Sequence, residues 1–268
     1  MPNKKANGVV KRGGEYYIPA SRVEEMLGAH FDEASVRGGG ALDGENANVP
    51  VAPWRIFMIM SEFVEGFEFL RQYQKAVTFF GSARCNLSDP VAIEATKLAS
   101  ALAGEGYAII TGGGPGIMAA ANKGASDAGG KSVGLNIKLK QEQRTNSFVK
   151  ESIAFHYFFT RKVMLSFASE MYVFFPGGFG TLDEFFEIVT LVQTEKISRV
   201  PVILVGKSYW QPLINWIEMG VYGHYKAIAK GDMEIYHLVD SAQEAMEKIK
   251  QLIHKVETPF VGADSGKP

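Results

Sequence analysis

Apolar and polar residues follow one another along the chain in blocks that predict strands and helices in turn from residue 75 onward. Short, continuous apolar runs are typical of strands that are buried on both faces of a sheet. The longer segments between them carry apolar residues at helical spacing. Strands are predicted at 76–80, 107–110, 131–137, 152–157, 171–175, 201–205 and 235–239. Helices are predicted at 54–73, 89–105, 117–128, 160–169, 185–192, 210–219 and 241–255.

This alternation predicts an α/β fold, in which helices cover both faces of a parallel sheet. Ligands of such folds bind outside the carboxyl ends of the strands. Glycine-rich turns follow the first, second and fifth predicted strands, at 81–84, 111–116 and 176–180. We therefore expect these three turns to meet at one edge of the sheet and to form a binding site there.

The first part of the chain has a different character. A short helix is predicted at 21–31, and a glycine and polar tract at 38–48 is typical of a linker. The pattern divides the chain into an extension (1–53), an amphipathic helix (54–74), an α/β domain (75–256) and a tail (257–268). The helix of residues 54–73 could pack on its own sheet or form an interface with another copy, and the sequence leaves both open.

Composition limits the function classes. The 268 residues carry a formal net charge of −1, which gives no electrostatic reason to expect a nucleic acid or a membrane surface as partner. The single cysteine, Cys85, allows no intrachain disulfide and favours a cytoplasmic location. The start of the chain shows no apolar signal segment. Charged residues within 54–73 argue against a membrane span.

The segment from Pro176 to Glu184 carries the strongest functional signal. It has the sequence Pro-Gly-Gly-Phe-Gly-Thr-Leu-Asp-Glu and joins a predicted strand to a predicted helix. Free backbone N–H groups and the positive end of the helix dipole favour an anion such as phosphate at this position. We expect Glu184 in the first helical turn, where its carboxylate would lie beside the bound group. An anion site with an adjacent acid indicates chemistry on a phosphorylated substrate.

Other cofactor and metal motifs are incomplete. The turn at 111–116 differs in spacing from a dinucleotide fingerprint, and the next strand lacks the acidic residue that binds a ribose. The five histidines show no metal-ligand spacing. Arg161 and Lys162 lie near the start of a predicted helix, where two cations oppose the dipole. They could hold an anion or form a surface charge pair.

Together these residues resemble the LONELY GUY (LOG) family of phosphoribohydrolases, once labelled lysine decarboxylases. Residues 176–184 fit the family's PGGxGTxxE signature, and Arg161-Lys162 fits its upstream arginine motif. The turns at 81–82 and 112–118 match its nucleotide loops. The resemblance covers residues 76–222 and implies a Rossmann-like, nucleotide-binding catalytic domain that forms homodimers or larger homo-oligomers.

The resemblance implies hydrolysis of the N-glycosidic bond of cytokinin riboside 5′-monophosphates, which releases free base and ribose 5-phosphate. It implies an AMP-like nucleoside monophosphate as substrate and neither cofactor nor metal. A broad purine nucleotide glycosidase and a non-catalytic nucleotide- or cofactor-binding protein are the alternatives. No pyridoxal-phosphate lysine motif supports the decarboxylase label.

Site residues follow from the same motifs. Arg161 and Glu184 would be the catalytic pair, and Asp183 and Glu187 are alternative acids. Met118 could contact the base or belong to the core. The residues implied in substrate binding are Gly81, Ser82, Gly113, Gly114, Met118, Lys162, Pro176, Gly177, Gly178, Gly180 and Thr181.

Overall fold

A computed structural model describes residues 10–12, 15–17, 53–138 and 145–257. The chain divides into two units, residues 1–53 and residues 54–268. Within the first unit, strands β1 (Val10–Arg12) and β2 (Glu15–Tyr17) form an antiparallel pair. The predicted helix at 21–31 and the linker after it lie outside the described residues.

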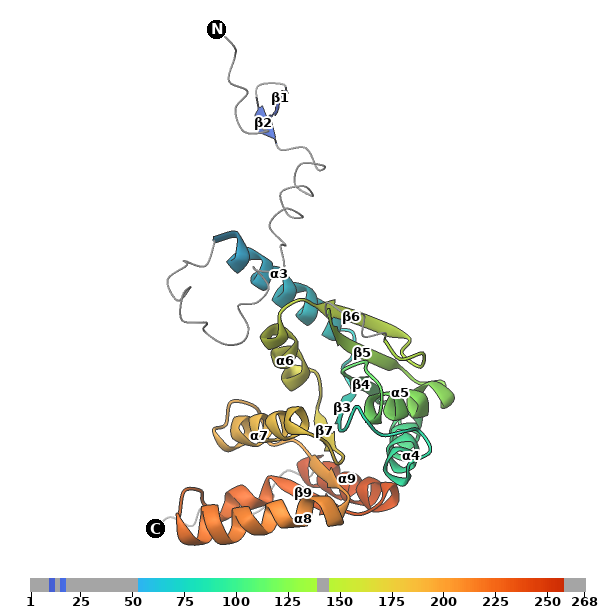
Figure 1. The fold of residues 1–268 in the computed structure, drawn as a ribbon, viewed down its shortest axis with the longest axis vertical. Helices are drawn as coiled ribbons and strands as arrows, with labels where there is room; N and C mark the ends of the chain where they lie inside the picture. Colours follow the sequence, from blue (N-terminus) through green and yellow to red (C-terminus); the bar gives the residue numbers. More distant parts are fainter. Residues whose placement is uncertain (1–9, 13–14, 18–52, 139–144, 258–268) are drawn as a thin grey trace, which may run out of the picture. The chain divides into compact units, whose positions relative to one another are not determined.

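The second unit contains a seven-stranded sheet in which every neighbouring pair of strands is parallel (Figure 1). The strand order is β6-β5-β4-β3-β7-β8-β9. This arrangement confirms the predicted α/β fold. The strands are β3 (Ala76–Phe80), β4 (Ala108–Thr111), β5 (Ser132–Ile137), β6 (Glu151–Phe155), β7 (Met171–Phe174), β8 (Val202–Val205) and β9 (Tyr236–Val239).

The apolar strands are buried on both faces because successive side chains point to opposite sides of the sheet. Val77 and Phe79 of β3 belong to one core cluster, whereas Ala76 and Phe80 belong to the other. Figure 1 shows α4 and α5 on one side of the sheet and α6 and α7 on the other. The first cluster includes α4 (Pro90–Gly104), α5 (Ile117–Asp127) and α9 (Ala242–Glu257). The second includes α3 (Pro53–Leu70), α6 (Phe158–Phe167), α7 (Phe179–Gln193) and α8 (Lys207–Trp216).

Two helices, α7 and α8, begin three or more residues before their predicted starts. α7 begins at Phe179, so Glu184 lies in its second turn and the prediction of a first-turn position is wrong. A glycine costs a helix only about 1 kcal/mol, and burial of the helix's apolar face outweighs that cost at Gly180. α8 starts at Lys207 and continues as a π-helix, Ile217–His224. A 3₁₀ helix, Lys230–Glu234, then leads towards β9. No described helix combines the length and the apolar character that a membrane crossing requires.

The strand order places a topological switch point between β3 and β7. From β3 the chain proceeds outward through β4 and β5 to β6, and it then returns to β7 on the other side of β3. The connections that follow β3 and β7 therefore leave the sheet in opposite directions and open a crevice at the carboxyl ends of these strands.

Candidate active site

A cleft of about 910 Å³ lies at this switch point. The end of β3 and the turns that follow β3, β4 and β7 line it, while α6, α7 and α8 contribute side chains from one side of the sheet. All three glycine-rich turns reach it, as the sequence predicts. The predicted site residues in its lining are Gly81, Ser82, Met118, Arg161, Pro176, Gly177, Gly178, Gly180, Thr181 and Glu184.

The turn after β7 leads directly into the N-terminus of α7. The Pro176 carbonyl accepts a hydrogen bond of 3.0 Å from the Ser82 N–H, which ties this turn to the one after β3. Gly178 is the N-cap residue of α7, and a Cβ atom at Gly177 would collide with the Thr181 side chain. The first N–H groups of a helix have no intrahelical acceptor. Gly180 and Thr181 therefore bring backbone donors and the positive helix dipole to the cleft wall.

Arg161 reaches the cleft from α6 and is fixed by two backbone carbonyls. Its Nε atom donates to the Leu135 oxygen at 2.6 Å, and its Nη2 atom donates to the Gly112 oxygen at 3.2 Å. Burial lowers the pKa of Arg161, and the charge of Glu184 opposes this effect. A guanidinium retains its charge in proteins, so Arg161 presents a fixed cation to the cleft.

Glu184 lies in the second turn of α7 and lines the same cleft as Arg161. Burial raises the pKa of Glu184 from 4.5 to about 7, since an apolar environment disfavours the ionised form. The positive charge of Arg161 opposes this rise, and the neighbouring charge of Asp183 adds to it. A carboxyl group with a pKa near neutrality, facing a fixed cation in a cleft, is typical of a general base.

Lys162 does not belong to the cleft lining. Its Nζ atom lies 2.6 Å from Asp183 Oδ2 and 3.6 Å from Glu187 Oε2, so it forms ion pairs with the carboxylates of α7 that flank Glu184. Burial lowers the pKa of Lys162, but the hydrogen bond to Asp183 and the charge of Glu187 outweigh it and the net pKa is raised. Lys162 thus links α6 to α7 beside the Arg161 and Glu184 pair.

The three glycines of the turn after β4 do not all line the cleft. Gly112 lines the cleft, and a Cβ atom there would collide with Arg161 Nη2 and come within 2.9 Å of Met118 Sδ. Gly113 and Gly114 are buried and are not among the lining residues. Gly112 therefore provides space for Arg161, a role that the dinucleotide comparison did not suggest.

A buried polar network holds this turn in place. The Thr111 hydroxyl accepts from the Gly113 N–H at 2.9 Å and donates to Asn122 Oδ1 at 2.6 Å. The Asn146 amide donates to Asn122 Oδ1 and to the Gly114 carbonyl, both at 3.0 Å. Buried polar groups that are fully bonded make a turn rigid. Gly113 and Gly114 thus contribute their backbone to the support of the cleft wall.

Several lining residues were not among the sequence candidates. Tyr209 of α8 donates from its hydroxyl to the Gly177 carbonyl at 2.7 Å. Phe158 and Leu165 share one face of α6 with Arg161, at positions i, i+3 and i+7, and this spacing could have identified them. The motif segment from 176 to 184 carries no signal for Tyr209, because that residue approaches from a distant helix. Phe79 and Phe80 of β3 and Leu182 of α7 are further additions. Four more lining residues belong to the three turns that the sequence predicts at the site: Ala83, Arg84, Gly112 and Phe179.

Two solved structures share this fold. They are the X-ray structure of the structural-genomics target TM1055 and that of the molybdenum cofactor binding protein from Rippkaea orientalis, each with 22% sequence identity and a TM-score of 0.50. The first likeness covers 66% of this chain and 99% of the other, and the second covers 67% and 98%. At this identity the likeness establishes the fold.

Sequence comparison identifies relatives of known name. A family model described as "possible lysine decarboxylase" matches residues 118–249. The cytokinin riboside 5′-monophosphate phosphoribohydrolase LOG of Oryza sativa subsp. japonica is 27% identical over 173 residues, which are 63% of this chain and 70% of the rice protein. The phosphoribohydrolase of Rhodococcoides fascians is 26% identical over 151 residues, which are 55% of this chain and 76% of the bacterial protein. The chain thus resembles the LOG family in sequence, and the family model that matches its residues 118–249 carries the lysine decarboxylase description.

Proposed function

We propose that this protein hydrolyses the N-glycosidic bond of nucleoside 5′-monophosphates and releases free base and ribose 5-phosphate. The observation that carries the proposal is the convergence of Glu184, Arg161 and the N-terminus of α7 in one cleft. A protein that only binds phosphate gains nothing from a carboxylate next to the anion, because like charges repel. The names of the LOG relatives support the reaction class.

The substrate's 5′-phosphate would lie at the turn after β7. Gly177, Gly178, Gly180 and Thr181 surround this position, and backbone N–H groups with a hydroxyl suit phosphate oxygens. Ser82, on the turn after β3, is bonded through its N–H to Pro176 and lines the same cleft, where its hydroxyl would bind the ribose. A phosphate fixed at the helix end would leave the anomeric carbon between the walls that carry Glu184 and Arg161.

The reaction would use Glu184 in its ionised form. As the bond between the anomeric carbon and the base nitrogen breaks, its electron pair leaves with the base and positive charge builds on the ribose, as in glycoside hydrolysis. The carboxylate would stabilise that charge and accept a proton from the attacking water, whose oxygen bonds to the anomeric carbon. Arg161 would stabilise the electron-rich departing base, which takes up a proton from solvent as it leaves, and Glu184 would then return the proton of the attacking water to solvent.

The base would lie against an apolar wall. Phe158 lines the cleft while 60% of its surface is exposed, and Phe80 and Leu165 line the same cleft. An exposed aromatic ring suits stacking on a purine and contact with an apolar substituent of a cytokinin. The wall is compatible with both a cytokinin riboside monophosphate and AMP. Because the LOG relatives are named for cytokinin nucleotides, we propose the cytokinin nucleotide as substrate and a broad purine range as the alternative.

Product analysis tests the proposed reaction. Purified protein is incubated with AMP and with isopentenyladenosine 5′-monophosphate, and free base and ribose 5-phosphate are quantified by chromatography. Release of both products from either nucleotide in equal amounts would support hydrolysis, and the ratio of kcat/KM values would give the base preference. Tight binding of both nucleotides without product would instead favour a nucleotide- or cofactor-binding protein, a class in which this fold also occurs.

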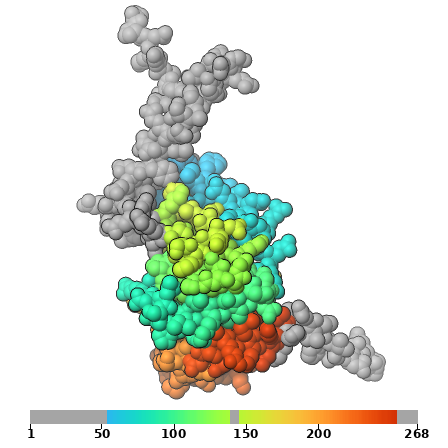
Figure 2. All heavy atoms as spheres, turned by 90° about the vertical axis from the view of Figure 1, so that its right-hand side faces the viewer, coloured from blue at the N-terminus to red at the C-terminus, as the bar shows by residue number. Residues whose placement is uncertain are grey.

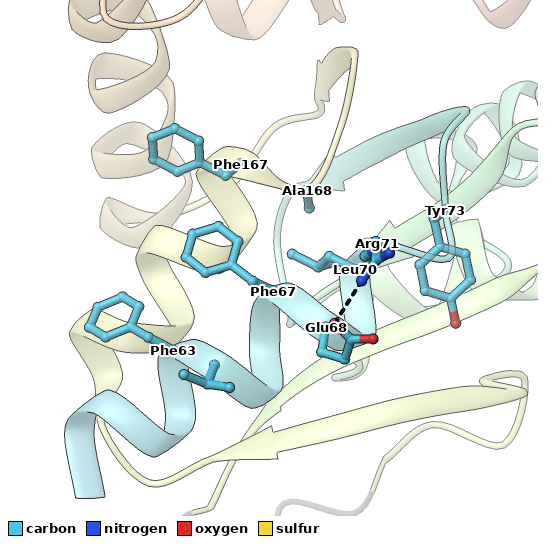
Figure 3. A pocket seen from close by; sticks show the side chains of 9 residues that line it. Phe63, Phe67, Glu68, Leu70, Arg71, Tyr73, Phe167 and Ala168 are labelled. Carbon is cyan, nitrogen blue, oxygen red and sulfur yellow. Dashed lines mark hydrogen bonds and ion pairs between the residues drawn. The ribbon is translucent and has the colours of Figure 1, made fainter. Parts of the chain in front are cut away.

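We also propose a homo-oligomer, a dimer or larger, in the cytoplasm. Support for the oligomer comes from α3, where large apolar side chains remain exposed at Phe57, Met60, Val64 and Phe67. Figure 3 shows Phe63 and Phe67 of α3 beside Phe167 of α6, at the rim of an apolar pocket. Light scattering on the full chain and on a Met60→Glu variant tests this assembly. The free thiol of Cys85 is consistent with a reducing compartment.

A further inference from the structure

A buried carboxylate on α3 contacts the start of the helix that carries Arg161. Glu62 is only 7% exposed, and a buried acid is rarely found without partners. Its Oε1 atom accepts from the His156 N–H at 2.5 Å and lies 3.1 Å from His156 Nδ1. Its Oε2 atom accepts from the Tyr157 N–H at 3.2 Å. Both backbone donors directly precede the first residue of α6.

Glu62 connects to Arg161 through a single residue. Tyr157 is the N-cap residue of α6, and its carbonyl accepts the N–H of Arg161 at 3.2 Å. The Tyr157 backbone is therefore bonded to Glu62 at its N–H and to Arg161 at its carbonyl. A negative charge at this end of α6 is also favourable because it faces the positive end of the helix dipole.

α3 packs closely on α6, which restricts movement of the two helices relative to each other. Gly66 lies one turn after Glu62, and a Cβ atom there would lie 2.5 Å from Met164 Sδ and 3.1 Å from the Phe155 ring. The Phe67 and Phe167 rings meet edge to face with centroids 6.5 Å apart. Figure 3 shows these two rings next to each other. Figure 2 shows the blue surface of α3 next to the yellow-green surface of β6, which leads into α6.

We propose that Glu62 is a positioning residue, which fixes the first turn of α6 so that the Arg161 guanidinium lies between the Gly112 and Leu135 carbonyls and faces Glu184. This inference rests on the proposed hydrolase function. It gives α3, which lies outside the residues matched by the family model, a part in catalysis. The hydrogen bonds of Arg161 tolerate little displacement, and a misplacement of about 1 Å can reduce a rate roughly 100-fold.

Kinetics of Glu62→Ala and Glu62→Gln test the proposal, with Glu68→Gln as the control on an exposed acid of the same helix. We expect kcat to fall roughly 10- to 100-fold in Glu62→Ala. Glu62→Gln retains one carbonyl acceptor and should recover part of the rate. The control should match the wild type. Because Arg161 lowers the pKa of Glu184, its displacement should also move the Glu184 limb of the pH–rate profile to higher pH.

Hydrogen exchange gives a second readout that does not depend on turnover. The Arg161 amide should exchange at least about tenfold faster in Glu62→Gln than in the wild type, while amides of β3 remain protected, because only local opening is enhanced. Wild-type kcat, an unmoved pH limb and wild-type exchange at Arg161 in both Glu62 variants would overturn the proposal. A wild-type protein without turnover would instead contradict the hydrolase function, and the exchange result would still decide the role of Glu62 in positioning α6.

Discussion

We expect the buried carboxyl group of Glu184 to lower the stability of the folded protein, and the size of this effect should depend on pH. Its pKa rises from 4.5 in an unfolded chain to about 7 in the folded protein, chiefly because it is buried. Between these values the unfolded chain releases the proton while the folded protein keeps it, so stability falls as pH increases. The variant Glu184→Gln removes this titration, so it should gain stability relative to the wild type as pH rises through the same interval.

The magnitude follows from the pKa difference. A rise from 4.5 to about 7 is about 2.5 pKa units, and at 1.36 kcal/mol per unit it corresponds to at most about 3.4 kcal/mol. Since solvent reaches part of the Glu184 side chain, we expect the difference in free energy of unfolding between Glu184→Gln and the wild type to change by about 1.5–3 kcal/mol. A domain of this size changes its Tm by roughly 2–4 °C per kcal/mol, so the advantage of Glu184→Gln should grow by roughly 3–12 °C between about pH 4 and about pH 8.

Thermal unfolding of both proteins across this pH range provides the assay. Glu170→Gln is the matched control, because Glu170 is exposed and lies outside the cleft. Its Tm difference from the wild type should stay constant with pH. A constant Tm difference for Glu184→Gln as well would refute the claim that burial holds this carboxyl protonated near neutrality.

Further predictions concern turnover. Since the ionised form of Glu184 is required, kcat/KM should rise about tenfold per pH unit below about pH 7 and level off above it. Gly112→Ala should reduce kcat/KM by about 100-fold or more with little change in Tm, because the new Cβ displaces the Arg161 guanidinium. Tyr209→Phe should raise KM about 2- to 10-fold and leave kcat nearly unchanged. The change removes the hydrogen bond to Gly177, which holds the turn that would bind the 5′-phosphate.

Each of these turnover predictions has a contrary outcome. A kcat/KM that falls as pH rises through this range would show that the protonated form of Glu184 is the active one. Gly104→Ala, at a glycine with open space around it, is the control for Gly112→Ala. Equal activity of these two alanine variants would show that Arg161 needs no space at Gly112. A KM of Tyr209→Phe that equals the wild-type value would remove Tyr209 from phosphate binding.

Local patterns predicted the fold because the strands are buried on both faces and hence appear as unbroken apolar runs. The strand at 76–80 has the observed bounds of β3, and the helix predicted at 89–105 differs from α4 by one residue at each end. The segment 152–157 has mixed polarity because β6 is an edge strand with exposed residues. The start of α7 was misplaced because glycines at its first turn resemble a loop.

The candidate site was predictable where one segment carries its residues and less so where distant segments meet. Gly177, Thr181 and Glu184 belong to one motif, and they line the cleft together. Lys162 follows Arg161 in the sequence, yet its charge is directed to the carboxylates of α7. That pairing depends on how two helices pack. The contact of Tyr209 with Gly177 likewise depends on tertiary packing, so local sequence patterns predict neither contact.

The most direct test of the account compares product release by the wild type and by Glu184→Gln under identical conditions at about pH 8, where Glu184 is ionised. Both proteins are incubated with AMP and with isopentenyladenosine 5′-monophosphate, and nucleotide binding is measured in parallel. We predict that the wild type releases base and ribose 5-phosphate in equal amounts, and that Glu184→Gln binds the nucleotide but releases neither product. Equal product release by the two proteins, or bound nucleotide that stays intact with the wild type, would contradict the account.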